Sequence, residues 1–149
     1  MRGGIACLAL VCSTLAIAQP LENACGQGQS EPVFSEIGTS EEEAAAFLAS
    51  LQGALASGDR RRVASMVQFP IAAWAGSRDE TFKNAAQLLA SYDRVFTERL
   101  KKTIGEARVQ CLFTNSQGAM IHDGEVWFRP VEGRGLMIIK INGPIGPAK

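Results

Sequence analysis

The side chains best suited to chemistry lie in one short stretch of the chain, His122-Asp123-Gly124-Glu125. A neutral imidazole beside two carboxylates can accept a proton as a general base or ligate a divalent metal ion. The same residue types are common on solvated turns that contain glycine, and residues 122 and 123 would face opposite ways if they lay in a strand. We therefore interpret this stretch as a solvated turn, assign no catalytic residue and predict no metal site.

Large rings and nearby cations form a second group of candidates. Tyr92, the only tyrosine, belongs to an apolar stripe, which favours a core ring whose hydroxyl is satisfied, with Asp93 beside it exposed or paired. The two tryptophans lie in strand-like segments, where they could line a ligand cavity or anchor a core. Two basic residues in the same segments could place a charge at the mouth of such a cavity. The predicted ligand-binding set is Trp74, Tyr92, Trp127, Arg129 and Lys140.

Several function classes find no support. The chain contains neither a G-x-S-x-G nucleophile motif nor a glycine-rich phosphate loop, so we predict no covalent catalysis and no cofactor. Fifteen Lys and Arg residues balance fifteen Asp and Glu residues, and the basic residues are scattered except for Arg60-Arg61-Arg62. A protein that neutralises many phosphates needs a basic stripe, so nucleic acid is not an expected partner.

The N-terminal residues have the pattern of a secretory signal. A positive n-region, an apolar h-region from Ile5 to Leu15 and the small-x-small site Ala16-Ile17-Ala18 predict a signal peptide over residues 1–18 and a mature chain that starts at Gln19. No cysteine follows a lipoprotein-type sequence, and the apolar run is short for a bilayer span. We expect a periplasmic or secreted protein without a stable membrane anchor.

Removal of the signal leaves two cysteines, Cys25 and Cys111, because Cys7 and Cys12 leave with it. In an oxidising compartment two remaining cysteines usually pair. The alternative is a buried thiol at Cys111 and a reactive one at Cys25. We predict a disulfide between them.

Three helices are expected in the first two thirds of the mature chain. Ser40 begins a capping box for the first, which Gly58 ends, and Asp59 can cap a second, shorter helix. The third and longest is predicted over residues 85–104, capped by Asn84 and ended by Gly105.

Strand-like runs dominate the C-terminal third. A short strand over residues 71–75 is expected at a sheet edge and is followed by a loop over residues 76–80. Residues 108–115 are apolar on both faces, which predicts a central strand. Two further strands are predicted over residues 125–129 and 136–141. The reversal between the first two of these three runs falls at 116–118 or at 123–124, and the pattern does not decide between them.

This order of elements resembles the nuclear transport factor 2-like superfamily, and in particular its small secreted bacterial members. The resemblance rests on GDRRRVASMVQFP, AQLLASYDRVF, LFTNSQGAMIHDGEVWF and the closing IIKIN. It implies a cone-shaped α+β fold in which three N-terminal helices pack on a curved, mainly antiparallel sheet. The implied organisation is an irregular lead-in over residues 19–39, one domain over 40–143 and a tail over 144–149.

The superfamily contains isomerases, dehydratases, cyclases and binding domains, so the resemblance leaves the activity open. We expect an exported, non-enzymatic module that binds a small hydrophobic ligand or a protein partner. The alternative is a cofactor-free acid/base enzyme that acts on a small hydrophobic substrate in the cone cavity through Tyr92, Asp93 or His122. An immunity-type protein that caps a secreted toxin is a third hypothesis. The sequence does not decide whether the chain forms a homodimer.

Overall fold

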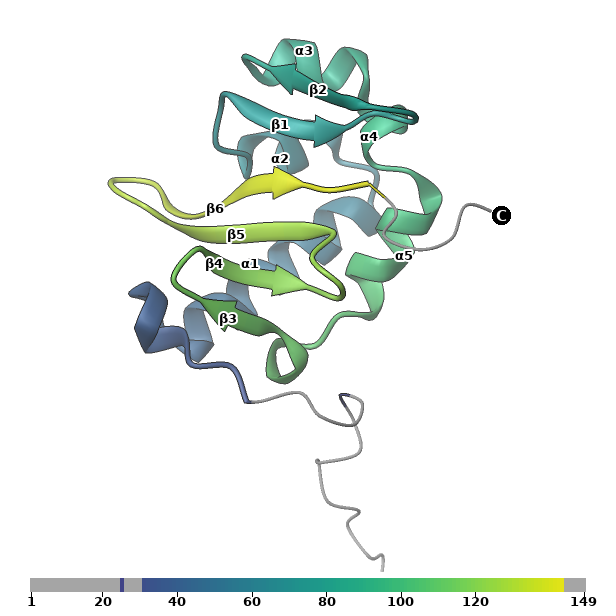
Figure 1. Cartoon of the computed structure of the whole chain (residues 1–149). Coiled ribbons are helices and arrows are strands. Elements are labelled where there is room, and N and C mark those ends of the chain that lie inside the picture. The colour runs from purple at the N-terminus through teal and green to yellow at the C-terminus, as the bar shows by residue number, and fades with distance from the viewer. Residues whose placement is uncertain (1–24, 26–30, 144–149) are drawn as a thin grey trace, which may run out of the picture.

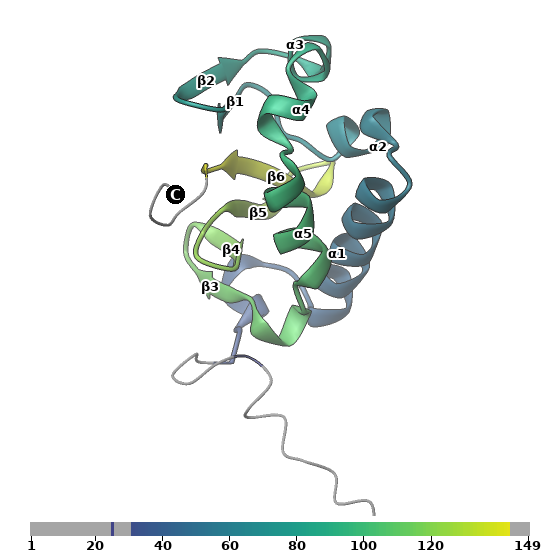
Figure 2. The same cartoon turned by 90° about the vertical axis from the view of Figure 1, so that its right-hand side faces the viewer.

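The computed structural model describes Cys25 and residues 31–143 (Figure 1). The predicted signal peptide, the predicted tail and most of the lead-in before residue 31 lie outside the described residues. The described chain forms two layers, a six-stranded sheet and a set of helices packed on one of its faces (Figures 1 and 2). None of the helices in this part of the chain is long and apolar enough to cross a membrane.

The sheet is antiparallel except at one pair of neighbouring strands. Its strands are β1 (Ile71–Trp74), β2 (Asp79–Phe82), β3 (Phe113–Asn115), β4 (Gly118–Ile121), β5 (Val126–Val131) and β6 (Gly135–Ile141). Their spatial order is β2-β1-β6-β5-β4-β3, and only β1 and β6 run parallel. The last strand of the described chain therefore lies inside the sheet and joins β1–β2 to β3–β5.

The helical layer is made of short elements around one longer helix. These are η2 (Phe34–Ile37), α1 (Glu41–Ala56), α2 (Arg60–Ser65), α3 (Ala85–Ala90), α4 (Tyr92–Val95), α5 (Glu98–Glu106) and η3 (Val109–Cys111). The 3-10 helix η2 and two α-helices precede the first strand, and the remaining helices follow β2. The α+β class and the mainly antiparallel sheet agree with the prediction.

The predicted helix starts are confirmed. The Ser40 side chain accepts a hydrogen bond from the Glu43 backbone, and the Glu43 carboxylate accepts one from the Ser40 backbone in return. Asp59 and Asn84 cap α2 and α3 by accepting hydrogen bonds from the Arg62 and Gln87 backbones. Gly58, which follows the C-cap Ser57 of α1, adopts a left-handed φ of 70°, as expected for the residue that ends a helix.

The single long helix predicted over residues 85–104 is wrong. The chain leaves helical geometry around Ser91 and again at Phe96, and Thr97 caps a new helix by accepting a hydrogen bond from the Leu100 backbone at 3.3 Å. The apolar spacing is satisfied by three short helices that bend around the core. Gly105 does not end the last of them, because α5 continues to Glu106.

The first strand was placed correctly, but its position at a sheet edge is wrong. The segment predicted as a loop over residues 76–80 turns the chain back into β2, which pairs with β1 along its whole length. The edge strand is therefore β2. Its residues, Asp79 to Phe82, are largely polar and only Phe82 is buried. The sequence of this strand therefore shows no alternation of apolar and polar residues that could have predicted it.

The central strand predicted over residues 108–115 is also wrong. Val109–Cys111 is a 3-10 helix, and only Phe113–Asn115 pairs, as β3 at the opposite edge of the sheet. Both candidate reversals are real turns, one after Asn115 and one after Ile121, so this third of the chain contains four strands. The apolar residues on both faces arise from the helical turn and not from a central position.

The space between sheet and helices is filled by side chains. Phe128 on β5 and Phe47 on α1 are buried with ring centroids 4.8 Å apart, and Phe96 and Ile104 are fully buried in the same cluster. The buried apolar residues of both layers, except Met137 on β6, belong to one continuous cluster. Such a core approaches the density of an organic crystal.

The lead-in is tied to the sheet edge at two points. The Val33 backbone donates a hydrogen bond to the Thr114 hydroxyl at 2.8 Å, and Phe34 is buried. Cys25 and Cys111 lie at disulfide-bonding distance with Cα atoms 4.9 Å apart, as the cysteine count predicted. The lead-in is thus not irregular throughout, because η2 packs against β3 and β4.

Candidate functional site

The turn between β4 and β5 brings the polar residues of the His122-Asp123-Gly124-Glu125 stretch together. His122 adopts a left-handed φ of 54° and Gly124 a φ of 93°, and the Gly124 backbone donates a hydrogen bond to the Ile121 carbonyl. The strand alternation that would separate residues 122 and 123 does not apply here. Nδ1 of His122 lies 3.3 Å from Oδ2 of Asp123 and 3.2 Å from Oε2 of Glu125.

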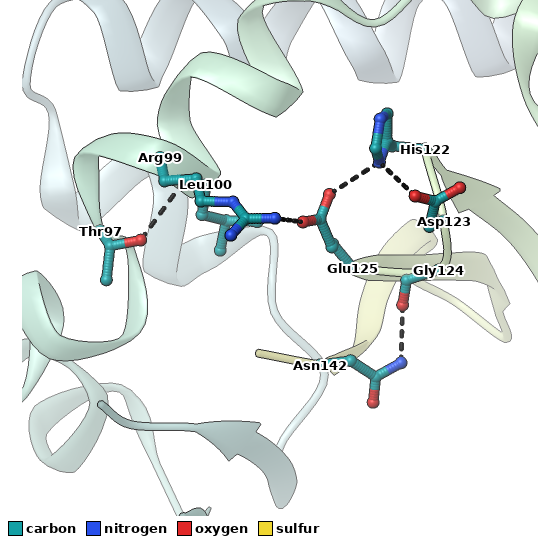
Figure 3. Close-up of polar contacts among 8 residues, drawn as sticks. All are labelled: Thr97, Arg99, Leu100, His122, Asp123, Gly124, Glu125 and Asn142. Atoms are coloured by element: carbon teal, nitrogen blue, oxygen red, sulfur yellow. Dashed lines mark hydrogen bonds and ion pairs between the residues drawn. The ribbon is translucent and has the colours of Figure 1, made fainter. Parts of the chain in front are cut away.

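Glu125 is the buried charge of this site. Its side chain is 2% exposed, whereas His122 and Asp123 are 55% and 66% exposed. Although the His122 imidazole is at ion-pair distance, Oε2 of Glu125 accepts no well-aligned hydrogen bond within the described part of the chain. A buried carboxylate oxygen without a hydrogen bond is costly, so Glu125 requires a hydrogen-bond donor or a cation from its neighbours. Figure 3 shows the imidazole and a guanidinium on opposite sides of the carboxylate.

The guanidinium belongs to Arg99 on α5. Its Nη2 lies 3.8 Å from Oε1 of Glu125, and the side chain is 53% exposed. Thr97 begins this helix and so fixes the position of Arg99 two residues later. Sequence reasoning missed Arg99, because the single-helix prediction placed the residue on a polar face with no reason to meet the β4–β5 turn.

Asn142, just after β6, holds the other side of the turn. Its side-chain nitrogen donates to the Gly124 carbonyl at 2.6 Å, and its backbone donates to the Glu125 carbonyl at 2.8 Å. The turn is therefore anchored from the end of a central strand. Its polar groups keep a defined position relative to α5 (Figure 3).

Two hollows lie on either side of these groups. A surface pocket of about 440 Å³ is lined by the end of α5, the disulfide, His122 and Asp123. A much smaller hollow of about 20 Å³ is bordered by Glu125, Arg99, Asn142 and Trp74, which is room for about one water molecule. The imidazole thus stands at the boundary between an open pocket and the buried carboxylate.

The described residues contain no cluster of three or more His, Cys, Asp or Glu side chains with the arrangement of a metal centre. What the site offers is one imidazole whose Nδ1 is taken by carboxylates. A carboxylate behind an imidazole orients the ring, which is the arrangement that acid/base chemistry uses.

The five predicted ligand-binding residues are not all brought together, because Tyr92 and Trp74 lie apart from the three on the outer face of the sheet. Tyr92 is 3% exposed and stacks on Phe96 at 4.9 Å, with the Arg60 guanidinium 5.0 Å from its ring and paired to Asp93. Burial raises the pKa of the Tyr92 phenol above its ordinary value of 10.0, although the nearby Arg60 opposes the shift. Tyr92 is a core ring, as the apolar stripe predicted. Trp74 borders the small hollow, against Gly143.

The other three members of the set lie on the sheet. Trp127 and Arg129 alternate with the buried Val126 and Phe128 along β5, so they face away from the helices. Lys140 on β6 is paired with Trp127 and lies on the same outer face. Arg129 also lines a surface pocket of about 390 Å³ beside η2.

A row of side chains crosses this outer face. In register from β3 to β6 it contains Phe113, Met120, Trp127 and Lys140. Phe113 is 39% exposed and the next two side chains are half-buried. The sequence analysis named two of the four, Trp127 and Lys140. It missed Phe113 and Met120 because the pairing register that aligns all four across the strands cannot be read from the sequence.

No protein-family model, curated protein or solved structure matches this chain.

Proposed function

We propose that the protein is an exported, non-enzymatic interaction module that binds a protein partner with an acidic surface through the outer face of its sheet. The observation that carries the proposal is the cross-strand row Phe113, Met120, Trp127 and Lys140. A contiguous row of partly exposed aromatic and thioether side chains is typical of a binding surface.

The filled interior supports a surface function over a ligand in a cone cavity. Phe96, Phe128 and Ile138 are fully buried where such a ligand would lie. The inward side of the sheet is committed to packing against the helices (Figure 2). No described helix covers the outer side.

The charges on the outer face specify the partner. Lys140 ends the row and Arg129 follows Trp127 on the same face of β5, and neither forms an ion pair within the described residues. Two cations beside an apolar row complement carboxylates on a partner. A second copy of the chain would place the same cations opposite each other, so a heterologous acidic partner fits better.

Export is part of the same proposal. The residue pattern of the signal peptide supports it, and so does the cysteine pair at bonding distance, which fits a non-reducing compartment. The periplasm and the exterior both meet this condition. N-terminal sequencing of the exported protein tests the processing site, and material that retains Met1 would contradict it.

Membership of the nuclear transport factor 2-like superfamily also remains our proposal. It is supported by the order α1, α2, β1 followed by further helices and a meander of four strands. An experimental structure in which the sheet curves around the helices as a cone would agree with this assignment. A flat, open sheet would contradict it.

Site-specific photo-crosslinking in the exporting cell tests the docking face. A photoreactive phenylalanine at position 113 should trap a partner, and the trapped partner segment should be acidic. The matched position is Ala46, which is exposed on α1 on the helical side of the molecule. The variant Lys140→Glu should weaken the crosslink at position 113 several-fold, because it reverses a charge on the row.

Equal trapping at positions 113 and 46, or no effect of Lys140→Glu, would refute the proposal. Circular dichroism of each variant verifies that the fold is retained. All three substituted positions are solvent-exposed, so their replacement leaves the core unchanged.

A further inference from the structure

Met120 is the one methionine of the described chain that is not buried. Its side chain is half-buried on the outer face of β4, whereas Met66 and Met137 are 7% and 4% exposed. In register it stands directly between Phe113 on β3 and Trp127 on β5. The thioether sulfur is thus part of the outer-face row, where an oxidant in solution can reach it without any opening of the core.

The sulfur lies beside a hydrogen-bond donor that no described residue uses. Sδ of Met120 and Nε1 of Trp127 both lie close to Gly124, because a Cβ built on this glycine would be 3.4 Å from the sulfur and 3.2 Å from the nitrogen. The indole N–H donates to none of the residues that the structure describes. A thioether sulfur is only a weak acceptor, so this donor faces no strong acceptor on Met120 while the sulfur is reduced.

We propose that Met120 is an oxidation site, at which a hydroperoxide converts the thioether to a sulfoxide and thereby weakens docking at the outer face. A lone pair of the sulfur attacks one peroxide oxygen, and the S–O bond forms as the O–O bond breaks. The proton of the transferred hydroxyl goes to the departing hydroxide or alkoxide. Sulfur is oxidised, and the hydroperoxide is reduced to water or an alcohol. The new sulfoxide oxygen is an acceptor beside the indole N–H of Trp127.

Oxidation changes the row in two ways that oppose docking. The sulfoxide is polar where the thioether was apolar, so a partner that covers it must remove its hydration. Its oxygen also carries partial negative charge, which repels the carboxylates of an acidic partner. This consequence rests on the docking function proposed above. The selectivity of the oxidation and the hydrogen bond from Trp127 do not.

Hydrogen peroxide added to the full, disulfide-bonded protein tests the site itself. Peptide mass spectrometry should show Met120 oxidised at least about tenfold faster than Met66 and Met137, because oxidation of either buried sulfur requires the core to open.

Nuclear magnetic resonance tests the new hydrogen bond, since the chain has only two tryptophans. The indole N–H signal of Trp127 should shift as the sulfoxide forms, and that of Trp74 should not. Met120→Leu, a substitution of similar volume, should abolish the shift, whereas Met137→Leu should retain it.

Crosslinking in the exporting cell tests the effect on docking. With the photoreactive phenylalanine at position 113, brief hydrogen peroxide treatment before irradiation should lower the crosslink several-fold, because the partner must then cover a polar group. The variant Met120→Leu should form the crosslink to the same extent with and without peroxide. This comparison separates oxidation of Met120 from oxidation of the partner or of the cell.

Three results would each overturn the inference. These are equal oxidation rates for Met120 and the two buried methionines, an unchanged Trp127 signal in the oxidised protein, and a crosslink that peroxide either leaves unchanged or lowers equally in Met120→Leu. A crosslink that fails to form at position 113 in untreated cells contradicts the docking function instead, and the purified protein still decides whether Met120 is the oxidation site. Amide spectra of Met120→Leu and Met137→Leu establish that both variants are folded.

Discussion

Loss of the Cys25–Cys111 disulfide should strongly destabilise the fold. The two cysteines are 86 residues apart along the chain, so the bridge closes a long loop in the unfolded state. In the chain-entropy treatment a loop of this length corresponds to about 4.6 kcal/mol at 25 °C. The Cα separation of 4.9 Å lies in the usual range for disulfides, and both cysteines are only partly buried, so serine at these positions leaves no large cavity.

Urea unfolding measures the effect. The double variant Cys25→Ser, Cys111→Ser should lose about 4 to 5 kcal/mol of unfolding free energy, which moves the midpoint by roughly 2 M for a protein of this size. Reduced wild-type protein should unfold at the same midpoint as the double variant. The reasoning is refuted if the unfolding free energies of the reduced and oxidised wild-type proteins differ by less than about 1 kcal/mol. Such a result would mean that Cys25 stays near Cys111 even without the bridge, so that the bridge restricts the unfolded chain very little.

Four further outcomes follow from single positions. Gly118→Ala should destabilise by about 2 kcal/mol or more in urea unfolding, because φ is 143° and the added carbon would lie 2.5 Å from a backbone oxygen of β5. Gly53→Ala, with open space at a helical position, should instead stabilise by about 0.5–1 kcal/mol in the same assay. Absorbance titration of Tyr92, the only tyrosine, should give a pKa above 10.0, because burial disfavours the charged phenolate. The folded protein should therefore lose stability as the pH rises from 10.0 through the pKa of Tyr92 in the folded state. The Arg94 hydrogen bond lowers the pKa of the Glu80 carboxyl below 4.5. The stability that this carboxylate contributes should therefore be present above pH 4.5 and be lost as the pH falls through the pKa of Glu80 in the folded state. In Glu80→Gln this part of the pH dependence of stability should be absent.

The parts of the fold that sequence predicted are those decided by near neighbours. Ser40, Asp59 and Asn84 each cap a helix through a backbone group a few residues away, so the pattern contains the whole interaction. The burial of Tyr92 was likewise visible in its apolar stripe. The cysteine pair followed from the cysteine count once the predicted signal peptide was set aside.

The parts that sequence missed are decided by distant partners. The polar strand β2 exists because β1 pairs with it, and its own residues give no alternation to detect. Ser91 and Thr97 interrupt a periodic apolar pattern that three short helices satisfy as well as one long helix. The strand over residues 108–115 failed because periodicity cannot distinguish a 3-10 turn from a buried strand.

The site itself was half predicted. His122 and Glu125 were named, but the stretch was interpreted as a solvated turn, and the burial of Glu125 to 2% was not foreseen. That burial depends on Arg99 and Asn142, which approach from α5 and from the end of β6. The residues close to His122 in the sequence give no indication of either contact.

The position of β6 sets the order in which the molecule can be completed. Residues 71–82 and 113–131 can each form a hairpin or meander alone, but they share no strand pairing until β6 enters between β1 and β5. Until residues 135–141 emerge from the ribosome, both half-sheets expose an edge that invites pairing with other chains. A chain translated or exported from its N-terminus therefore closes its sheet last, and a nonsense mutation before Gly135 would leave two unjoined halves and no fold.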